Sequence, residues 1–305
     1  MIELTHVSKR YGQVVAVEDV SMHVGAGRIF GLIGHNGAGK STLIKMMLGI
    51  LPASEGDIRI RGREVRGPGF RDLRRGISYL PENVALYDNL TGLETMRFLA
   101  RLKSADAAQC AELLGRVGLA DAMHRNVREY SKGMRQRLGF AQALIGKPEL
   151  LFLDEPTNGL DPVAIHAFYD ALAVLRDDGA TILISTHLLA EIQTRVDGLA
   201  IIANGRLIAQ GTVAGLTAEA DLPVELRLQV RESALERVLR ELDETGFVTL
   251  AAYDETTVVC NVMRMHKIEL LSALAGMGDM LAEFEFREPT LEALYLHHQH
   301  QGSRP

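Results

Sequence analysis

The most chemically specific stretch of the chain is the nonapeptide GHNGAGKST at residues 34–42. It fits the phosphate-binding pattern G-x-x-x-x-G-K-[ST] with Gly34, Gly39, Lys40 and Ser41. Glycines let successive backbone N–H groups face a phosphate, and the start of a helix adds partial positive charge. We expect Lys40 to reach the β- and γ-phosphates of a nucleotide and Ser41 to coordinate Mg²⁺. The alternative is a glycine-rich turn without a ligand, which the correctly placed Lys-Ser pair disfavours.

A second candidate is the pair of acids that ends the apolar run LLFLDE at 150–155. We expect Asp154 to hold the hydration shell of Mg²⁺ and Glu155 to polarise the attacking water as a general base. Taken alone, such a run is equally consistent with an ordinary strand end. The phosphate-binding loop earlier in the chain favours the catalytic interpretation.

Ser131 supplies a third candidate, because it precedes the helical pattern KGMRQRLGFAQALI. We expect its hydroxyl to cap this helix, and the hydroxyl, the Gly133 N–H and the helix dipole to form a second anion site. A chain cannot readily aim this site at the nucleotide on its own loop. The alternative is a helix cap without a ligand.

The elements that must position these residues form a layered pattern. Strand-like runs alternate with helical patterns over residues 1–215 and predict an α/β domain, the runs lying at 14–24, 28–34, 77–81, 149–156, 180–186 and 198–211. Residues 82–145 are almost wholly helical in pattern. Residues 222–305 follow a βαββαβ order with a last helix at 290–299, which predicts a small α+β ferredoxin-like domain.

Composition limits the function classes. The 305 residues are 47% hydrophobic and carry a net charge of −6. The chain therefore lacks the excess of basic residues that is typical of nucleic-acid-binding proteins. No apolar run approaches a membrane span, and the N-terminus has no signal-peptide core, so we expect a cytoplasmic chain. Cys110 and Cys260 support neither a disulfide framework nor a zinc site.

The segment YSKGMRQRL at 130–138 resembles the signature of ABC-transporter ATPases, and its Ser131 lies 23 residues before Asp154. The resemblance continues through NGLD at 158–161 and STH at 185–187, and covers nearly all of residues 1–215. It implies the P-loop NTPase fold of ABC ATPases with a helical signature subdomain, and ATP hydrolysis with Mg²⁺.

The resemblance also implies roles for single residues. Tyr11 stacks on adenine, His187 holds the γ-phosphate and the attacking water, and Asp161 bridges a head-to-tail homodimer. Each signature then caps the γ-phosphate bound by the partner copy. The implied nucleotide contacts are Tyr11, Gly34, His35, Asn36, Gly37, Ala38, Gly39, Lys40, Ser41, Thr42, Ser131, Lys132, Gly133 and Asp161.

The sequence departs from the common family pattern at Glu82, where the family usually has a glutamine that touches the metal or its water. We expect Glu82 to bind the metal together with Ser41 and Asp154, although its charge adds to that of the γ-phosphate. Lys132 and Met134 likewise replace the commonest signature residues.

The stretches GHNGAGK, YLPENV, RFLARLK and SKGMRQRLGFAQAL resemble ATPase subunits of the NosF type, which serve copper-site maturation of nitrous oxide reductase. This resemblance implies a homodimer on the inner face of the cytoplasmic membrane, bound to a polytopic permease and, through it, to a periplasmic accessory protein. The alternatives are an ATPase of a drug, polysaccharide or lipid exporter of the same branch, and a soluble ABC ATPase acting on nucleic acid or ribosomes. A single cassette with an acidic balance disfavours the last.

Soft metal ligands occur in the C-terminal part, for which we expect an accessory, dimerisation or regulatory role. Cys260, Met263, Met265 and His266 offer copper ligands, as does HHQH at 297–300. Strand alternation predicts that Met263 and Met265 share one face, as ordinary core residues also do. We favour the core and tail interpretations over copper binding.

Overall fold

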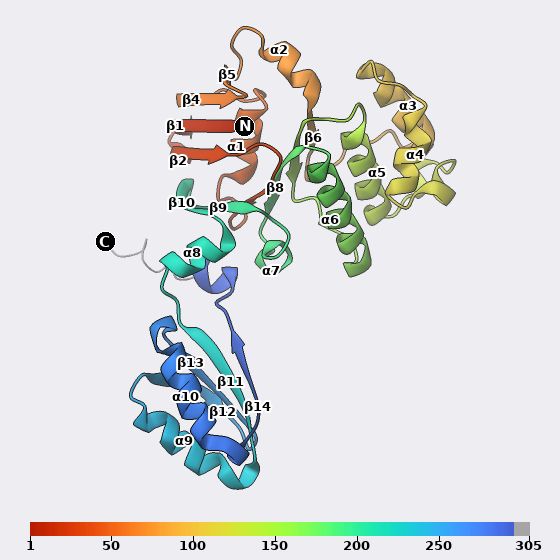
Figure 1. Cartoon of the computed structure of the whole chain (residues 1–305). Coiled ribbons are helices and arrows are strands. Elements are labelled where there is room, and N and C mark those ends of the chain that lie inside the picture. Colours follow the sequence, from red (N-terminus) through yellow and green to blue (C-terminus); the bar gives the residue numbers. More distant parts are fainter. Residues whose placement is uncertain (296–305) are drawn as a thin grey trace. The chain divides into compact units, whose positions relative to one another are not determined.

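The computed structural model describes residues 1–295, which divide into two compact units (Figure 1). Unit 1 is Met1–Thr212, and unit 2 begins at Val213. The candidate residues around the phosphate-binding loop all belong to unit 1.

The central sheet of unit 1 has the strand order β10-β9-β3-β8-β7-β6. Its strands are β3 (Ile29–Ile33), β6 (Ile77–Leu80), β7 (Leu150–Asp154), β8 (Thr181–Thr186), β9 (Gly198–Ala203) and β10 (Arg206–Gly211). All neighbours are parallel except β10 and β9. Strands β3, β7, β8 and β9 are buried along their whole length, as parallel strands covered on both faces must be. Strands β3, β6, β7 and β8 were each predicted from a separate apolar run, whereas β9 and β10 were expected as one run at 198–211.

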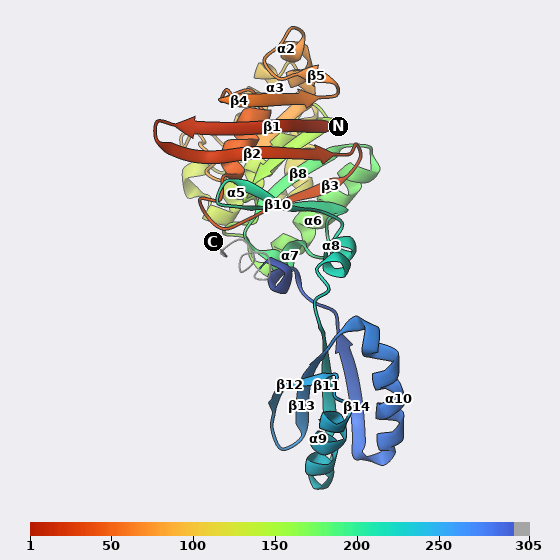
Figure 2. The same ribbon diagram turned by 90° about the vertical axis from the view of Figure 1, so that its left-hand side faces the viewer.

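A second, antiparallel sheet has the order β2-β1-β4-β5 (Figure 2). Its strands are β1 (Ile2–Tyr11), β2 (Val14–Val24), β4 (Glu55–Ile60) and β5 (Arg63–Glu64). Helix α1 (Lys40–Met47) packs in one core with both sheets, a core that includes its Leu43 and Met46 together with Ile2 of β1 and Phe30 of β3. Sequence analysis predicted β2 but missed β1 and β4, and also the short β5. Strands β1 and β4 complete the layer that covers α1.

The helical part of unit 1 comprises α3 (Gly92–Leu102), α4 (Gln109–Arg116) and α5 (Lys132–Leu144), which Figure 1 shows grouped together. They confirm the helical signature subdomain. The other helices are α2 (Phe70–Leu73), α6 (Pro162–Asp177) and α7 (Leu189–Ile192), with the 3-10 turn η1 (Arg74–Gly76) after α2. Each of α3, α5 and α6 begins at a capping residue, namely Thr91, Ser131 and Asp161.

Unit 2 begins with α8 (Val213–Glu219) and continues as a βαββαβ domain. Its elements are β11 (Val224–Val230), α9 (Leu235–Glu244), β12 (Val248–Tyr253), β13 (Thr257–Val262), α10 (Lys267–Met277) and β14 (Leu281–Arg287). The sheet is antiparallel with the order β12-β13-β11-β14, which confirms the ferredoxin-like fold. A helical segment follows at 291–295, and the predicted tail ligands at 297–300 lie outside the described residues.

Candidate nucleotide site

The phosphate-binding loop joins β3 to α1, in the strand–loop–helix order that the motif requires. Gly37 and Gly39 have φ values of 82° and 106°, which side chains other than glycine rarely adopt. A Cβ on Gly34 would lie 2.3 Å from the Ile202 carbonyl oxygen, and one on Gly39 would lie 2.6 Å from that of Ala16. The loop therefore needs glycine both for its conformation and for its close packing.

The loop lines an open cavity of about 320 Å³ at the start of α1. Every residue from His35 to Thr42 contributes to it, together with Ala16, Glu82 and Glu155. A nucleotide polyphosphate fits this position, because backbone N–H groups and the positive end of α1 meet here. His35 itself lies with Nδ1 2.7 Å from the Asn36 carbonyl oxygen.

Lys40 is 5% exposed, and its ammonium group turns back onto the loop. Nζ donates to the carbonyl oxygens of Gly34 at 2.5 Å and His35 at 3.2 Å, and lies 3.1 Å from Glu155 Oε1. That carboxylate oxygen makes no hydrogen bond of good geometry, so the contact is an ion pair only. A buried charge must be paired, and Lys40 and Glu155 pair with each other here.

Asp154 and Glu155 follow each other at the carboxyl end of β7 and use their oxygens differently. Asp154 Oδ1 accepts hydrogen bonds from Ser41 Oγ at 3.1 Å and Ser185 Oγ at 2.6 Å. Glu155 has a φ of 48°, an uncommon value for a residue with a side chain, and Oε2 lies 2.8 Å from His187 Nδ1. The strained turn thus directs the two acids to different partners.

The donor set around Asp154 suits Mg²⁺. This ion takes oxygen ligands in octahedral geometry, with one or two protein ligands and the rest from water and phosphate. Ser41 lines the phosphate cavity, and its Oγ lies 3.1 Å from Oδ1 of the buried Asp154, so the two residues offer such a pair. Glu82 is exposed and lines the same cavity from the loop after β6.

Sequence reasoning did not assign a role to Ser185, although the structure places it at the centre of the site. It is fully buried at the end of β8, directly opposite Asp154 in the register of β7 and β8. Its hydroxyl donates to Asp154 Oδ1 and accepts from the Glu155 N–H at 3.0 Å. The available signal was the pair of hydroxyl residues ending the apolar strand TILIST.

Tyr79 is a second such residue. It lies on β6 with its hydroxyl 3.5 Å from Asp154 Oδ2. Burial, and next the Asp154 charge, raise the pKa of Tyr79 above its ordinary value, so the phenol stays protonated.

The remaining predicted residues are not gathered at this cavity. The cap prediction is confirmed, since Ser131 Oγ accepts from the Met134 N–H at 3.2 Å. The described residues that line the cavity of about 320 Å³ do not include four of the predicted nucleotide contacts, namely Ser131, Lys132, Gly133 and Asp161. A Cβ on Gly133 would lie 3.1 Å from the Gly159 carbonyl oxygen. Tyr11 on β1 is 49% exposed, with Lys9 Nζ 5.2 Å from its ring centre.

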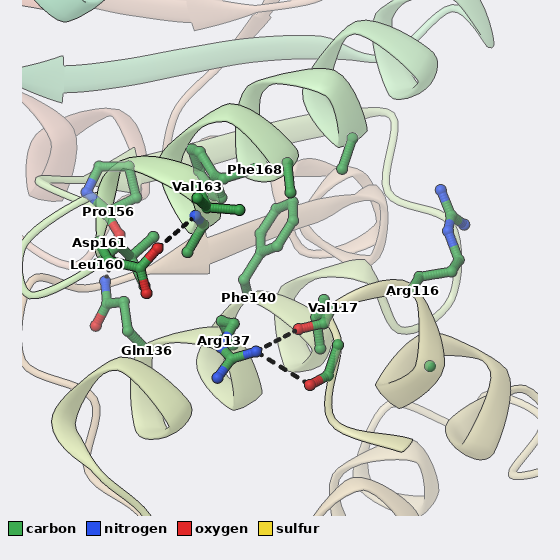
Figure 3. A pocket seen from close by; sticks show the side chains of 15 residues that line it. Arg116, Val117, Gln136, Arg137, Phe140, Pro156, Leu160, Asp161, Val163 and Phe168 are labelled. Carbon is green, nitrogen blue, oxygen red and sulfur yellow. Dashed lines mark hydrogen bonds between the residues drawn. The ribbon is translucent and has the colours of Figure 1, made fainter. Parts of the chain in front are cut away.

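Asp161 caps α6 by accepting from the Ala164 N–H at 2.9 Å, beside a second cavity of about 390 Å³ (Figure 3). Phe140 of α5 and Phe168 of α6 line this cavity and pack together with ring centres 4.6 Å apart. Figure 3 also shows Arg137 donating to the carbonyls of Val117 and Gly118. This ring contact packs α5 against α6.

The prediction that Met263 and Met265 share a strand face is wrong. Strand β13 ends at Val262, Met263 precedes the 3-10 turn Arg264–His266, and Met265 lies within that turn and is 78% exposed. Cys260 is buried with Sγ 3.7 Å from the Leu226 carbonyl oxygen, and His266 Nδ1 lies 2.7 Å from Glu269. Among residues 1–295, no three His, Cys, Asp or Glu side chains gather as a metal site.

Comparison with known proteins identifies the chain. Residues 17–158 match the family model of the ABC transporter. The lantibiotic transport ATP-binding protein SrtF of Streptococcus pyogenes is 37% identical over 210 residues, which cover 69% of this chain and 90% of that protein. This chain belongs to the ABC transporter ATP-binding proteins.

Other relatives of this ABC ATPase extend over unit 2 as well. A fluoroquinolones export ATP-binding protein of Mycobacterium tuberculosis is 38% identical over 283 residues, 90% of this chain and 89% of that one. An ATP-binding subunit of an ABC transporter matches in structure with a TM-score of 0.66 at 35% identity, covering 72% of this chain and 92% of that one. At 22% identity, an ATP-binding cassette solved as a dimer with ADP and Pi shares the fold, with a TM-score of 0.65 over 70% of this chain and 99% of that one.

The family assignment makes the chain an ATPase that binds ATP. Within residues 1–295, no helix is both long enough and apolar enough to span a membrane.

Proposed function

We propose that this ATPase drives a separate membrane permease from the cytoplasmic face of the inner membrane, as a head-to-tail homodimer. The observation that carries the proposal is the arrangement of Lys40, Glu155 and His187 at the phosphate-binding loop. A base, its orienting histidine and a phosphate-binding lysine meet within hydrogen-bond reach. These are the kinds of residue that transfer of a phosphoryl group to water requires.

The residues of the chain divide the hydrolysis between them. Glu155 accepts the proton of the water that attacks the γ-phosphorus, while His187 holds the carboxylate in position. Lys40 leaves its carbonyl partners and Glu155 for the phosphate oxygens, which frees Glu155 to act as the base. Ser41 and Asp154 would hold Mg²⁺, which supplies charge neutralisation at the β- and γ-phosphates when bound.

The dimer is supported by the position of the signature. The Ser131 hydroxyl and the Gly133 N–H lie at the start of α5, away from the chain's own nucleotide cavity. An anion site with no ligand in its own chain suits a phosphate held by a second copy. The relative solved with ADP and Pi is described as a dimer.

Substitution of Glu155 by glutamine tests the assignment of the base. The amide keeps the shape and the bond to His187 but cannot accept a proton. We expect ATP binding to remain, turnover to fall by about 100-fold or more, and an ATP-bound dimer to accumulate. Steady-state phosphate release, equilibrium ATP binding and size-exclusion chromatography measure these quantities. Wild-type turnover in this variant would exclude Glu155 as the base.

For the cargo, we infer copper-site maturation of nitrous oxide reductase, with a periplasmic accessory protein reached through the permease. The support is the resemblance of GHNGAGK, YLPENV and SKGMRQRLGFAQAL to the NosF type. The relatives named for lantibiotic transport and fluoroquinolone export favour a second candidate, export of a peptide or drug.

A strain lacking the chain separates the two candidates. Loss of copper from nitrous oxide reductase, restored by the wild-type chain but not by the Glu155→Gln variant, supports maturation. Unchanged copper content together with increased intracellular drug or peptide supports export.

For unit 2 we propose a dimerisation role, with regulation as the alternative. The edge strand β12 carries no charged residue, and its Leu250 and Tyr253 are 46% and 58% exposed. An uncharged, exposed edge strand is a template for pairing with another strand. The opposite edge strand, β14, carries Glu283, Glu285 and Arg287, which protect it.

A further inference from the structure

A concentration of positive charge lies outside the nucleotide site. Residues 59–75 contain seven arginines against two acids, Glu64 and Asp72, a net charge of +5. Because the whole chain carries −6, the other residues together carry −11. We call this group the arginine corner, and it comprises Arg59, Arg61, Arg63, Arg66, Arg71, Arg74 and Arg75.

The arginine corner is one protruding part of unit 1. Its residues lie on β4, β5, α2 and η1 and on the short connections between them, which Figures 1 and 2 show together at one end of the unit. All seven arginine side chains are exposed. Arg61 and Arg63 line a hollow of about 410 Å³ with Asp72 and Leu73.

The backbone of this corner is held in place. Phe70, 4% exposed, belongs to the core shared by both sheets of unit 1. The Val65 N–H donates to the Ile58 carbonyl oxygen at 2.8 Å, and β5 pairs with β4. The arginines therefore project from an ordered surface.

Most of the charge in the corner has no partner. Arg61 pairs with Glu149, and Arg63 donates to the Gly69 carbonyl oxygen at 3.3 Å. The other five guanidinium groups have no carboxylate within 4.0 Å among residues 1–295, these being Arg59, Arg66, Arg71, Arg74 and Arg75. Some arginines elsewhere in unit 1 are neutralised, as Arg176 is by Asp177 and Asp197.

The chemistry of the corner favours phosphate groups spread over a surface. A guanidinium group donates in a fork that matches phosphate oxygens, and clusters of arginine attract anionic lipid headgroups. Single-stranded nucleic acid also needs aromatic side chains for base stacking. The single aromatic residue between positions 59 and 76 is Phe70, which is buried, and the charge of −11 on the other residues repels a polyanion that extends beyond the corner.

We propose that the arginine corner binds the anionic phospholipid headgroups of the membrane on which the permease is inserted. This inference rests on the proposed function, which brings the chain to that membrane. Arg74 and Arg75 lie in η1, which directly precedes β6, and β6 leads to the loop of Glu82. Lipid contact at the corner therefore anchors the segment that enters the nucleotide site, independently of the permease.

The test uses the purified full chain without permease and two kinds of vesicle, one of phosphatidylcholine and one of phosphatidylcholine with phosphatidylglycerol in equal amounts. We expect co-sedimentation with the second only, and release as salt is raised. Equal binding to both vesicles would overturn the proposal, as would displacement from the anionic vesicles by inorganic phosphate at the ionic strength of a chloride control. Preferential retention of transfer RNA in a competition with anionic vesicles would overturn it in favour of nucleic acid.

A triple variant localises the effect. Each arginine at an anionic surface contributes about a fivefold factor, so Arg71→Ala/Arg74→Ala/Arg75→Ala should weaken vesicle binding by about 100-fold. The matched control removes three exposed arginines of the helical subdomain, as Arg97→Ala/Arg101→Ala/Arg116→Ala. Equal losses in the two variants would contradict a specific corner.

ATP hydrolysis without vesicles is measured on the same samples and reports separately on the proposed function. We expect both triple variants to hydrolyse ATP as the wild type does and to unfold at the same temperature. A wild-type chain that binds vesicles but does not hydrolyse ATP would refute the proposed function alone. A chain that hydrolyses ATP but does not bind anionic vesicles would refute the arginine corner alone.

Discussion

Ser185 joins the two acids of the nucleotide site into one unit. Its hydroxyl donates to the Asp154 carboxylate and accepts from the Glu155 N–H, so one oxygen fixes both neighbours. Both contacts are buried, where a lost hydrogen bond leaves a polar group without a partner. Ser185 is therefore a positioning residue for Asp154 and Glu155.

We predict that Ser185→Ala lowers the ATPase rate by about 10- to 100-fold, a loss typical of removing a group that orients a catalytic ligand. Tyr79→Phe is the matched control, because its 3.5 Å contact with Asp154 is weak and should cost much less. Phosphate release at saturating ATP, with KM determined separately, measures the effect. Ser185→Thr should recover part of the rate, and an alanine variant at full rate would contradict the positioning role.

Both cysteines are buried free thiols of low reactivity in the folded chain. Burial raises the pKa of Cys260 to about 11, and burial also raises the pKa of Cys110. Thiolate, the reactive form, is then scarce at neutral pH. We predict that iodoacetamide modifies neither thiol at pH 7.5 unless urea is added, as read by mass spectrometry. Rapid modification of Cys260 without urea would show that the core of unit 2 opens.

At the scale of elements, sequence patterns predicted best where one physical requirement dominates. Parallel strands must be apolar throughout, so the runs of the central sheet were recognised, and Ser131 was recognised as a cap from its place before a helix. Strand β1 was missed, although Ile2 and Leu4 alternate with Glu3 and Thr5 as a half-buried strand does.

What sequence could not supply was proximity between distant segments. Ser185 reaches Asp154 only because β7 and β8 are neighbours in register. Met263 and Met265 lie outside the predicted strand, because β13 ends at Val262 and a 3-10 turn follows. Sequence analysis did not single out the arginines of residues 59–75, because it considered only the net charge of −6, in which opposite charges cancel over the whole chain.

Helix α3 begins with a capping box that makes a prediction about acid stability. Thr91 Oγ1 accepts from the Glu94 N–H at 3.2 Å, and the Thr91 N–H donates to Glu94 Oε2 at 2.8 Å. We predict that Thr91→Ala lowers the free energy of unfolding by about 1 kcal/mol near neutral pH, measured by urea denaturation. Thr290→Ala, a hydroxyl at the start of the segment at 291–295, is a control outside α3.

The same box has a pH dependence. Hydrogen bonds from the Thr91 backbone and hydroxyl lower the pKa of Glu94 below its ordinary value of 4.5. A lowered folded-state pKa stabilises the fold above pH 4.5 and loses this effect as pH falls through the folded value. The stability difference between wild type and Thr91→Ala should therefore shrink below pH 4.5. A difference that stays constant down to pH 3 would contradict the box.

At the scale of the whole molecule, unit 2 has one protected edge and one open edge. A twofold axis through the middle of β12 pairs the strand with itself in an antiparallel ladder, and the absence of charge on β12 avoids like charges facing each other. Two copies joined by ATP at unit 1 hold their C-terminal units at high effective concentration. Pairing through β12 would then keep the copies together after hydrolysis.

We predict that the full chain dimerises without nucleotide, and that Leu250→Glu/Tyr253→Glu weakens this dimer by at least about 10-fold, because carboxylates would face each other across the new ladder. Both side chains are half exposed, so the monomer should fold normally.

Phe284→Glu is the matched control, since Phe284 is 47% exposed on the opposite edge strand. Sedimentation velocity over a concentration series measures the dimer, and the ATP-bound Glu155→Gln background shows whether unit 1 still associates. A double variant that dimerises as the wild type does without ATP would exclude β12 as the interface, whereas loss of both dimers would place it within the ATP-dependent contact.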